Sequence, residues 1–378
     1  MTFDLHVLGV ASARPSHDRS VSGSILKTSE GLVCIDAGEG FQIRLADQRK
    51  HIKTYDSKSR LRMSKLNCIL LTHGHMDHTW GLLPWIKSLS LEGRRDELLV
   101  MGPTSPGVYE LIKKDGYDAE LPKSVPTAEL FRQIKHWIAM GGRSSELNYN
   151  IRWVLGDIRS DSWIEIESDT LEIIELEKMP QPSPWSEHYV EPIQTVHSVP
   201  SCAWRIASKP KQGKFDRKKA DLSGLTVEEK KSLSLGVDVV KGETKFRASE
   251  FRGDGKKGVS IVISGDTSAP CDGLSKMEGA DVLVHECTYL SEHSEKACEY
   301  MHSTTLGALE NALASNSKFL ALTHYSARID DISDALNEVK GNLGDSEIGL
   351  CALNDGDRII LSEDGIVQHL AKTKAGWS

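Results

Sequence analysis

The sequence predicts an α/β fold in which β-sheets are covered by helices, and two observations carry this prediction. Short apolar runs recur along the chain, and several are continuously apolar over four to six residues, as in strands covered on both faces. Helical patterns alternate with these runs, as at 304–316 and 332–343. The expected strands lie at 5–10, 23–28, 31–38, 66–72, 260–266, 281–286 and 318–324.

The composition is that of a globular protein with an acidic balance. The chain has 378 residues, of which 39% are hydrophobic and 26% charged, so a fibrous, collagenous or disordered chain is excluded. Its formal charge is -8. A protein of this charge does not bind nucleic acid through its overall charge, so we expect any such binding to use a local patch.

The termini and cysteines predict a cytoplasmic protein. No apolar run approaches the ~20 residues that span a bilayer, and the N-terminus lacks the basic start and apolar stretch of a signal peptide. The seven cysteines are scattered and form no C-x-x-C pair, so neither a disulfide framework nor a structural cysteine zinc site is expected. We therefore expect no membrane partner.

We expect one domain over residues 1–378, with two segments of different character. Residues 115–168 have a mixed pattern and are expected to be an insertion of unknown role. Residues 209–258 are polar, and six basic residues stand against one acid between Lys209 and Lys219. From the charges alone, this second segment is either a solvated surface excursion or an arm that binds phosphates.

One loop carries the strongest chemical signal. His73, His75, Asp77 and His78 lie within six residues, directly after the apolar run 66–72. The carboxyl ends of strands are where α/β folds place their ligands. Three imidazoles and a carboxylate on one tight loop provide ligands for zinc-like ions. The loop therefore predicts a metal site.

Three further residues follow or lie beside apolar runs in the same way. Asp266 follows 260–265, His324 follows 318–323, and His197 lies in IQTVHSVPSC. Alone, the aspartate could be a helix cap and either histidine a satisfied core residue. Together with the loop they make seven ligand groups, enough for two metal ions if one carboxylate bridges. Two ions can stabilise both the attacking and the leaving oxygen of a phosphoryl displacement.

Several segments resemble one known family. The metal loop, the distant histidine, the aspartate of G-D-T and the final histidine resemble the metallo-β-lactamase superfamily, and more narrowly ribonuclease Z, the endonuclease that matures tRNA 3′ ends. The narrower resemblance rests on LGVASARPSHDRSVSGSIL, IDAGEGFQIRL, HSVPSCAWRI, HECTY, HSTTLGAL and LTHYSAR. It covers roughly residues 1–112, 190–220 and 240–360. It implies the αββα sandwich of metallo-β-lactamases, here with insertions.

The resemblance implies a centre of two zinc ions, for which Mn²⁺ or Fe²⁺ are alternatives because these ligands suit more than one metal. The ligands implied for the first ion are His73, His75, His197 and Asp266, and those for the second are Asp77, His78, His324 and the same bridging Asp266. Asp36, in the D-A-G-E-G turn, is expected to orient the ligands from behind. A plain turn-forming aspartate is the alternative for Asp36.

The resemblance also implies the reaction. A hydroxide would attack the phosphodiester of precursor tRNA and release the 3′ trailer, leaving a 3′-hydroxyl and a trailer with a 5′-phosphate. Asp77 would hold the attacking water and accept its proton. His302, supported by Glu286, would protonate the leaving oxygen. Without the family, a helix-start histidine beside a capping Ser303 would be the simpler interpretation of His302.

In the family, an arm after the third metal motif grips the tRNA elbow, often on behalf of the partner subunit of a homodimer. The resemblance therefore implies precursor tRNA as partner, no DNA partner, and a homodimer. The residues expected to contact RNA are Arg19, Lys209, Lys211, Lys214, Arg217, Lys218 and Lys219.

Three departures from the family keep alternatives open. The arm lacks a Gly-Pro-rich tip, Asp18 alters the loop before Arg19, and residues 115–168 have no counterpart. The main alternative is a phosphodiesterase or other hydrolase of this fold that acts on a small ester. A metal-binding or RNA-binding module without catalysis is the third.

Overall fold

Two β-sheets carry the fold of residues 3–378, the part of the chain that this computed structural model describes. The strands of the ten-stranded sheet, in spatial order, are β18 (Val367–Leu370), β17 (Arg358–Leu361), β1 (Phe3–Gly9), β2 (Gly23–Lys27), β3 (Leu32–Ala37), β4 (Leu66–Leu70), β5 (Leu98–Pro103), β6 (Ile151–Asp157), β7 (Ser162–Ile166) and β8 (Ile173–Leu176). Those of the six-stranded sheet are β16 (Gly349–Ala352), β15 (Phe319–Thr323), β14 (Val282–Glu286), β13 (Ser260–Ile263), β10 (Cys202–Ser208) and β9 (His188–Gln194).

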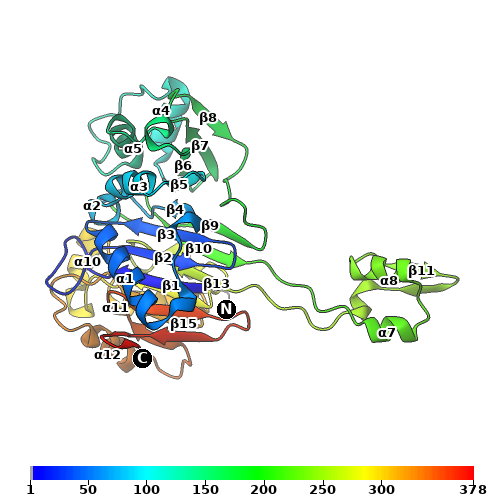
Figure 1. The fold of residues 1–378 in the computed structure, drawn as a ribbon. Helices are drawn as coiled ribbons and strands as arrows, with labels where there is room; N and C mark the ends of the chain where they lie inside the picture. The colour runs from blue at the N-terminus through cyan, green and yellow to red at the C-terminus, as the bar shows by residue number, and fades with distance from the viewer. Residues whose placement is uncertain (1–2) are drawn as a thin grey trace. The chain divides into compact units, whose positions relative to one another are not determined.

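Helices cover the outer face of each sheet, so the larger part of the chain has four layers (Figure 1). The helices beside the ten-stranded sheet are α1 (Phe41–Tyr55), α2 (Met76–Thr79), α3 (Leu82–Leu91), α4 (Pro106–Asp115), α5 (Leu130–Ala139) and α6 (Ser144–Leu147). Those beside the six-stranded sheet are α9 (Asp272–Ser275), α10 (Ser294–Tyr300), α11 (Thr305–Ala314) and α12 (Ile332–Gly341). A small hairpin, β19 (Lys372–Thr373) with β20 (Gly376–Trp377), lies near the C-terminus.

Burial explains why the strands read as continuous apolar runs. Every residue of β1 and of β3 is buried, because both faces of these strands are covered. On the outer face, Ile25, Ile69 and Trp153 join one apolar core with the buried side chains of the covering helices. The two sheets face each other across the inner layer, where Trp204 of β10 donates to the carbonyl of Leu71 at 2.9 Å.

The stretch expected to be an insertion, 115–168, is woven into the larger sheet. Its second half forms β6 and β7, and β6 pairs with β5 in parallel along six residues. Its first half includes α5, whose Phe131 and Ile138 are fully buried in the outer core. The segment therefore extends the sheet rather than standing apart from it.

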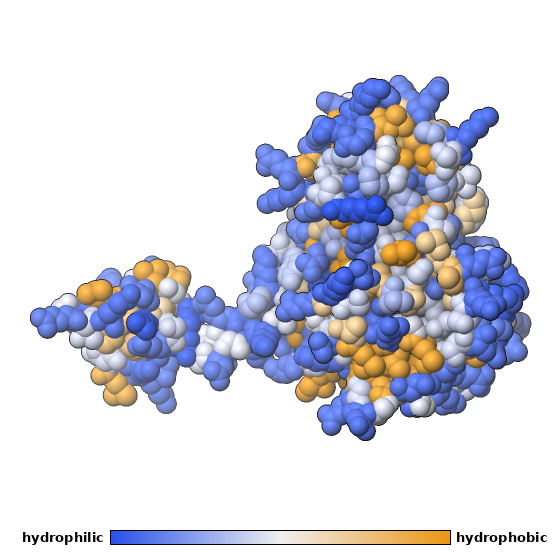
Figure 2. Space-filling model, turned by 180° about the vertical axis from the view of Figure 1, so that it is seen from behind, coloured by the Kyte–Doolittle hydropathy of each residue, from blue (hydrophilic) through white to orange (hydrophobic). Residues whose placement is uncertain are grey.

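Residues Ser208–Val259 form a second, smaller compact unit, and the larger one holds the rest of the described chain. The expected arm, 209–258, falls within one residue of these bounds. The elements of the smaller unit are α7 (Arg217–Leu222), α8 (Val227–Ser234), β11 (Val239–Lys241) and β12 (Thr244–Phe246). They enclose a core of their own, made by Ala220, Leu225, Leu233, Ala248 and Phe251. Figure 2 shows apolar residues at the surface of this unit, among which Leu222 is 90% exposed.

Across the described residues, no helix has the length and apolar character needed to cross a membrane.

Arg358 of β17 joins the two ends of the chain through a buried ion pair. Its guanidinium donates two hydrogen bonds to Asp4 of β1, at 2.7 and 3.0 Å, and a third to Asp56 at 2.9 Å. The same guanidinium lies 4.7 Å from the ring centre of Trp377. Burial raises the pKa of Asp4, but the neighbouring His6 and Arg358 outweigh it and hold the pKa well below its usual value.

We predict that Arg358→Met destabilises the protein by about 3–5 kcal/mol, because it leaves the Asp4 carboxylate buried without its partner. Urea unfolding at neutral pH measures this change. The double variant Asp4→Leu/Arg358→Met should recover most of the loss, since both buried charges are gone. Because the folded pKa of Asp4 lies below its unfolded value near 3.8, the wild type should lose this contribution as the pH falls below that value. A single variant as stable as the wild type would contradict the prediction.

Candidate metal centre

The seven expected metal ligands meet at one edge of the two facing sheets. β13, β14 and β15 run parallel, so their carboxyl ends lie side by side and present Asp266, Glu286 and His324. β3 and β4 run parallel in the other sheet and end at Asp36 and at the metal loop. A hydrogen bond of 2.9 Å from the amide of Cys202 to the carbonyl of Thr72 ties this loop to the six-stranded sheet.

Asp36 holds the loop from behind. Its carboxylate accepts hydrogen bonds from the amide and the hydroxyl of Thr72, both at 2.8 Å, and from Nδ1 of His78 at 2.7 Å. With Nδ1 of His78 committed as a donor to Asp36, Nε2 is the nitrogen that faces the centre of the site. Burial lowers the pKa of His78, but the carboxylates of Asp266, Asp36 and Asp77 outweigh it and raise the pKa well above its ordinary value, so a metal ion bound there would displace the proton of Nε2. Asp36 thus contacts both Thr72 and a predicted ligand, and its role in orienting the ligands stays a prediction.

The first group of ligands consists of His73, His75, His197 and Asp266, whose ligand atoms all lie within 4.8 Å of one another. Nδ1 of His75 lies 3.0 Å from Nε2 of His73 and 3.2 Å from Nε2 of His197. The opposite nitrogen of His197 donates to the carbonyl of Met301 at 2.9 Å. Nδ1 of His197 is thus committed to this carbonyl, and its Nε2 faces His75 with a lone pair.

The second group consists of Asp77, His78, Asp266 and His324, which meet the same 4.8 Å limit. Nε2 of His78 lies 3.3 Å from Nε2 of His324, and both lie within 3.3 Å of Oδ1 of Asp266. Nδ1 of His324 lies 3.0 Å from the hydroxyl of Thr288, which itself donates to Glu286. Nε2 of His324 thus also presents a lone pair.

These groups fit a pair of divalent cations. Imidazole nitrogens that point lone pairs at one another repel unless a cation lies between them. Oδ1 of Asp266 is buried and has no hydrogen-bond donor among the described residues, an arrangement that costs free energy unless a charge compensates it. Asp266 belongs to both groups, so its carboxylate is placed to bridge two ions.

The protonation states suit metal binding. Burial lowers the pKa of His73 and of His197, and burial with neighbouring histidines lowers that of His75 to about 4, so these rings are neutral at pH 7. Burial opposes ionisation of Asp266, but His324, His78 and His73 outweigh it and hold the pKa of Asp266 well below its usual value. Neutral imidazoles and an ionised carboxylate are the forms that bind a metal.

Glu286 and His302 form a hydrogen-bonded pair beside the ligands. Oε1 of Glu286 accepts a hydrogen bond from Nδ1 of His302 at 2.9 Å, and Oε2 accepts from the amide and hydroxyl of Thr288. Burial lowers the pKa of His302, but the charge and hydrogen bond of Glu286 outweigh it and raise the pKa to about 9. The ring of His302 is 14% exposed, so its Nε2 can reach a bound substrate.

The backbone at the site is held in unusual conformations. Asp36 and His324 both have positive φ, at 56° and 62°, which costs of order 1–3 kcal/mol each for residues other than glycine. Gly265 precedes Asp266 with φ of 57°, and a β-carbon there would lie 2.5 Å from that of Thr72. The close packing of the two sheet ends therefore requires glycine at this position.

Several supporting residues could not be found by searching for metal ligands. The hydroxyls of Thr72 and Thr288 lie within hydrogen-bond distance of Nδ1 of His73 and of His324, respectively. Thr72 directly precedes His73, and Thr288 lies two residues after Glu286, so each is close to a residue that the motifs do identify. The side-chain amide of Gln133, in α5, donates to the carbonyl of Gly74. A β-carbon on Gly74 would lie 1.8 Å from the carbonyl oxygen of Ala128. The segment 115–168 thus supports the metal loop from outside.

The expected RNA contacts divide into two sets. The side chains of Lys209, Lys211, Lys214, Arg217, Lys218 and Lys219 are all exposed on the smaller unit. The expectation for Arg19 is wrong, because its side chain is buried at 7% exposure and donates to the carbonyl of Ile329 at 2.8 Å. Arg19 anchors the loop that follows β1, and it is not available to a surface ligand.

Comparison with known sequences shows which proteins this chain is similar to. No protein-family model matches it. It is 29% identical over 328 residues to the protein named ribonuclease Z of Prochlorococcus marinus subsp. pastoris, covering 85% of this chain and 87% of that protein. It is 28% identical over 336 residues to the ribonuclease Z of Methanosarcina acetivorans (88% and 91% covered) and 29% over 336 residues to that of Listeria innocua (86% and 90%).

Solved structures share the fold at lower identity. The human short-form tRNase Z superposes with a TM-score of 0.50 at 20% identity, covering 94% of this chain and 98% of that one. The metallo-β-lactamase-fold protein YhfI of Bacillus subtilis superposes with a TM-score of 0.54 at 14% identity, covering 95% and 99%. A long-form RNase Z from yeast gives 0.54 at 13% identity, covering 94% of this chain and 41% of that protein.

The protein therefore has the metallo-β-lactamase fold, and the αββα sandwich expected from the sequence is confirmed. Within that fold, the recognition of ribonuclease Z is also confirmed: the chain is a homologue of curated proteins of that name over most of its length.

We predict that Asp266→Asn lowers the divalent metal bound per chain to less than about half of the wild-type value, because both ligand groups lose the only charge they share. Metal analysis after dialysis against limiting zinc measures this, and the rise in Tm on adding zinc gives a second readout. Asp272→Asn, an exposed aspartate on α9, is the control and should bind metal like the wild type. Unchanged metal content in the Asp266 variant would rule out the bridging role.

Proposed function

We propose that this protein is a metal-dependent endoribonuclease that removes the 3′ trailer from precursor tRNA. The observation that carries the proposal is that one chain, similar along most of its length to ribonuclease Z, brings two ligand groups and the Glu286–His302 pair to the same sheet edge. The same geometry is compatible with phosphodiester hydrolysis in general. The similarity to ribonuclease Z selects tRNA as the substrate class.

The ligands assigned to the two ions are those expected from the sequence: His73, His75, His197 and Asp266 for one, and Asp77, His78, His324 and Asp266 for the other. When bound there, two divalent ions, which we propose to be zinc, supply positive charge that polarises a phosphate and makes water more acidic. Thiolate ligands are absent from both groups, so manganese and iron suit them as well.

Asp77 is placed to accept the proton of the attacking water. The charge of His78 and the hydrogen bond of His324 outweigh burial and hold the pKa of Asp77 well below its usual value, so it is ionised at neutral pH. The amide of Ala13 donates to its Oδ2 at 2.8 Å and fixes the carboxylate in position. The water oxygen bonds to phosphorus as its proton passes to Asp77.

His302 supplies the second proton. Its Nδ1 is bound to Glu286, so the proton on Nε2 is the one offered to the leaving oxygen as the bond between phosphorus and the 3′ oxygen breaks. The tRNA keeps a 3′-hydroxyl and the trailer keeps the 5′-phosphate. Glu286 favours the protonated form of His302 and fixes its orientation, held in turn by Thr267 and Thr288.

We further propose that the smaller unit, Ser208–Val259, binds RNA through the exposed cations between Lys209 and Lys219. Lys219 is the least available of them, because its ammonium donates to the carbonyl of Glu250 and lies 5.3 Å from the ring centre of Phe251. A homodimeric assembly and RNA rather than DNA as substrate complete the proposal and rest on the resemblance to ribonuclease Z. The cytoplasmic location that we propose rests on the scattered cysteines.

We predict that Asp77→Ala lowers the rate of cleavage of a 5′-labelled precursor tRNA at least about 10²-fold, since the acceptor of the water proton and a metal ligand are both lost. Gel analysis of metal-loaded protein should show one cut at the end of the acceptor stem. Chelation should abolish the cut, and Asp272→Ala, which removes an exposed carboxylate, should leave it unchanged. If the tRNA stays intact while bis(p-nitrophenyl) phosphate is hydrolysed, the protein is instead a phosphodiesterase acting on small esters.

We predict that Glu286→Gln moves the basic limb of the pH–rate profile to lower pH. The charge of Glu286 raises the pKa of His302 to about 9, and removing that charge lets the pKa fall. Because the protonated ring is the donor, activity should be lost at a lower pH than in the wild type, while the acidic limb keeps its place. Single-turnover cleavage at saturating protein measures the profile. A basic limb that does not move would remove His302 from the proton donor role.

A further inference from the structure

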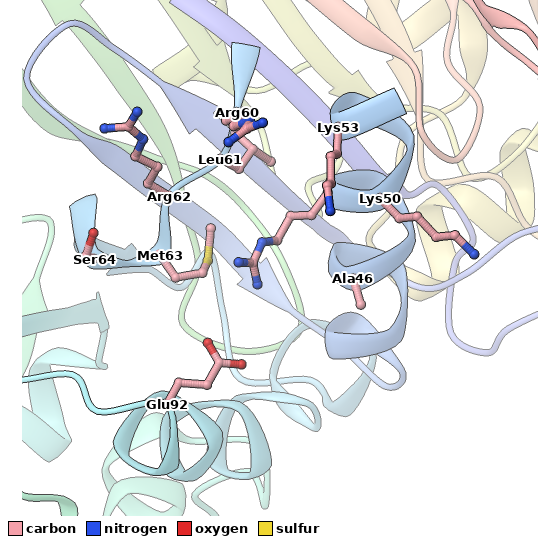
Figure 3. Close-up of a pocket in the computed structure, with 10 residues that line it drawn as sticks. Ala46, Lys50, Lys53, Arg60, Leu61, Arg62, Met63, Ser64 and Glu92 are labelled. Carbon is pink, nitrogen blue, oxygen red and sulfur yellow. The ribbon is translucent and has the colours of Figure 1, made fainter. Parts of the chain in front are cut away.

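A cationic cavity lies far from the metal centre, between the C-terminal half of α1 and the segment that leads into β4 (Figure 3). Its volume is about 740 Å³. Arg49, Lys50 and Lys53 line it from α1, and Arg60 and Arg62 line it from the facing segment. Glu92, just beyond α3, is the single acidic residue in its wall.

A second cavity continues the first. It has a volume of about 280 Å³ and shares Arg60 and Arg62 with the larger one. It adds three more cations, Lys27, Lys58 and Lys65. The residues that define this basic groove are Lys27, Arg49, Lys50, Lys53, Lys58, Arg60, Arg62 and Lys65.

Buried apolar side chains hold both walls of the groove in place. Along residues 60–63 the exposed Arg60 and Arg62 alternate with the buried Leu61 and Met63. The two apolar side chains pack into the outer core and hold the segment in place, so both guanidinium groups face outward. On α1, the buried Ile52 anchors the helix while Arg49 and Lys53, one turn apart, face solvent.

Eight cations line the groove against two acids, Glu92 in the first cavity and Glu30 in the second. The segment 49–65 carries seven cations and one acid in a chain whose formal charge is -8. That acid, Asp56, is bound to Arg358, and Glu30 beside the groove is bound to His188 and its neighbours. Within residues 3–378, none of the eight side chains that define the groove takes part in an ion pair or hydrogen bond. Arg49 and Lys53, four residues apart on one helix, also repel each other.

We propose that the basic groove binds the phosphate backbone of RNA. Cations spread over two joined cavities suit a series of phosphates better than a single anion. Neither cavity is lined by an aromatic side chain on which a base could stack, so the groove would position RNA without reading its sequence. An acidic protein that handles RNA requires such local positive surfaces.

The groove is connected to the metal centre by a single strand, so one RNA molecule can contact both. β4 connects the two sites: Lys65 immediately precedes this strand, and the metal loop follows it. His73 lies eight positions after Lys65, so along the strand these two residues are about 26 Å apart at ~3.3 Å per residue. An RNA cut at the metal centre is long enough to reach the groove. As a contact to the substrate of this enzyme, the groove rests on the proposed function; as an RNA-binding site, it does not.

The test compares two variants with the same change in charge. The groove variant is Arg49→Gln/Lys53→Gln/Arg60→Gln/Arg62→Gln. The control variant is Lys114→Gln/Lys123→Gln/Lys178→Gln/Lys340→Gln, four exposed lysines outside the groove. Fluorescence anisotropy with a mature, uncleavable tRNA gives Kd as a function of salt. Hydrolysis of bis(p-nitrophenyl) phosphate, expected to be equal in all three proteins, reports that the metal centre is intact.

We expect the groove variant to bind RNA at least about ten-fold more weakly at moderate salt, and the slope of log K against log salt to fall by about 2–3, as for three or four lost phosphate contacts. The control variant should stay within about two-fold of the wild type. Wild-type Kd and slope in the groove variant would overturn the proposal, whether or not the wild type cleaves tRNA. RNA binding that is lost in the groove variant of an enzyme that does not cut tRNA would instead reject only the proposed function.

A second arm separates the two sources of phosphate. ATP with Mg²⁺ is titrated into the wild-type protein and into the groove variant under the same salt conditions. The proposal expects weak ATP binding that does not displace the RNA at equal concentration. If ATP binds the wild type as tightly as RNA does and loses that affinity in the groove variant, the groove is a free-nucleotide site and the proposal fails.

Discussion

The burial of the Asp266 carboxylate is the constraint on which the site depends. This residue is 2% exposed, one of its oxygens has no hydrogen-bond donor among the described residues, and imidazoles surround it on two sides. A buried carboxylate is tolerated only where positive charge compensates it. Asp36, Met301 and the threonine hydroxyls occupy the outer nitrogens of four of the surrounding histidines, so the inner nitrogens of these four rings face the centre of the site. The buried negative charge of Asp266 is therefore compensated fully only when cations bind between the carboxylate and these histidines.

The fold makes this arrangement possible by packing two sheets face to face, with the ends of their strands at a common edge. Parallel strands align their carboxyl ends, so β13, β14 and β15 present residues that are up to 58 positions apart in the sequence at neighbouring points. The metal loop comes from the other sheet, and the close approach of Gly265 to Thr72 joins the two. Strain at Asp36 and His324 is borne where the surrounding contacts over-determine the backbone. The packing of strands on both sides of the metal centre therefore fixes the positions of the ligands.

The sequence predicts residues whose position follows from a strand end, but not residues whose position depends on tertiary contacts. Ligands that directly follow apolar runs, such as Asp266 and His324, were accessible because the strand itself marks where its end must lie. Residues 115–168 were not accessible, because β6 pairs beside β5 through contacts that no local pattern encodes, and because Gln133 acts on Gly74 from 59 positions away. The expectation for Arg19 was wrong for the same reason: the resemblance of its loop to the family implied an RNA contact, while its partner, the carbonyl of Ile329, lies 310 positions further on. Whether a charged side chain is buried depends on tertiary contacts, which a charge pattern in the sequence does not show.

The basic groove is formed by a cationic stretch that belongs to no sequence motif. Residues 49–65 are the most cationic stretch of comparable length outside the smaller unit's own basic run, yet no known motif covers them and a charged helix end is ordinarily solvated. The structure shows what this stretch forms, because it places the end of α1 opposite Arg60 and Arg62, with Glu92 as the one acid in the wall of the larger cavity. An enzyme with net negative charge repels RNA everywhere except at such surfaces. Because positive charge is confined to a few surfaces, the rest of the protein disfavours nonspecific contacts with RNA. The charge distribution therefore orients the RNA on the protein as well as contributing to its affinity.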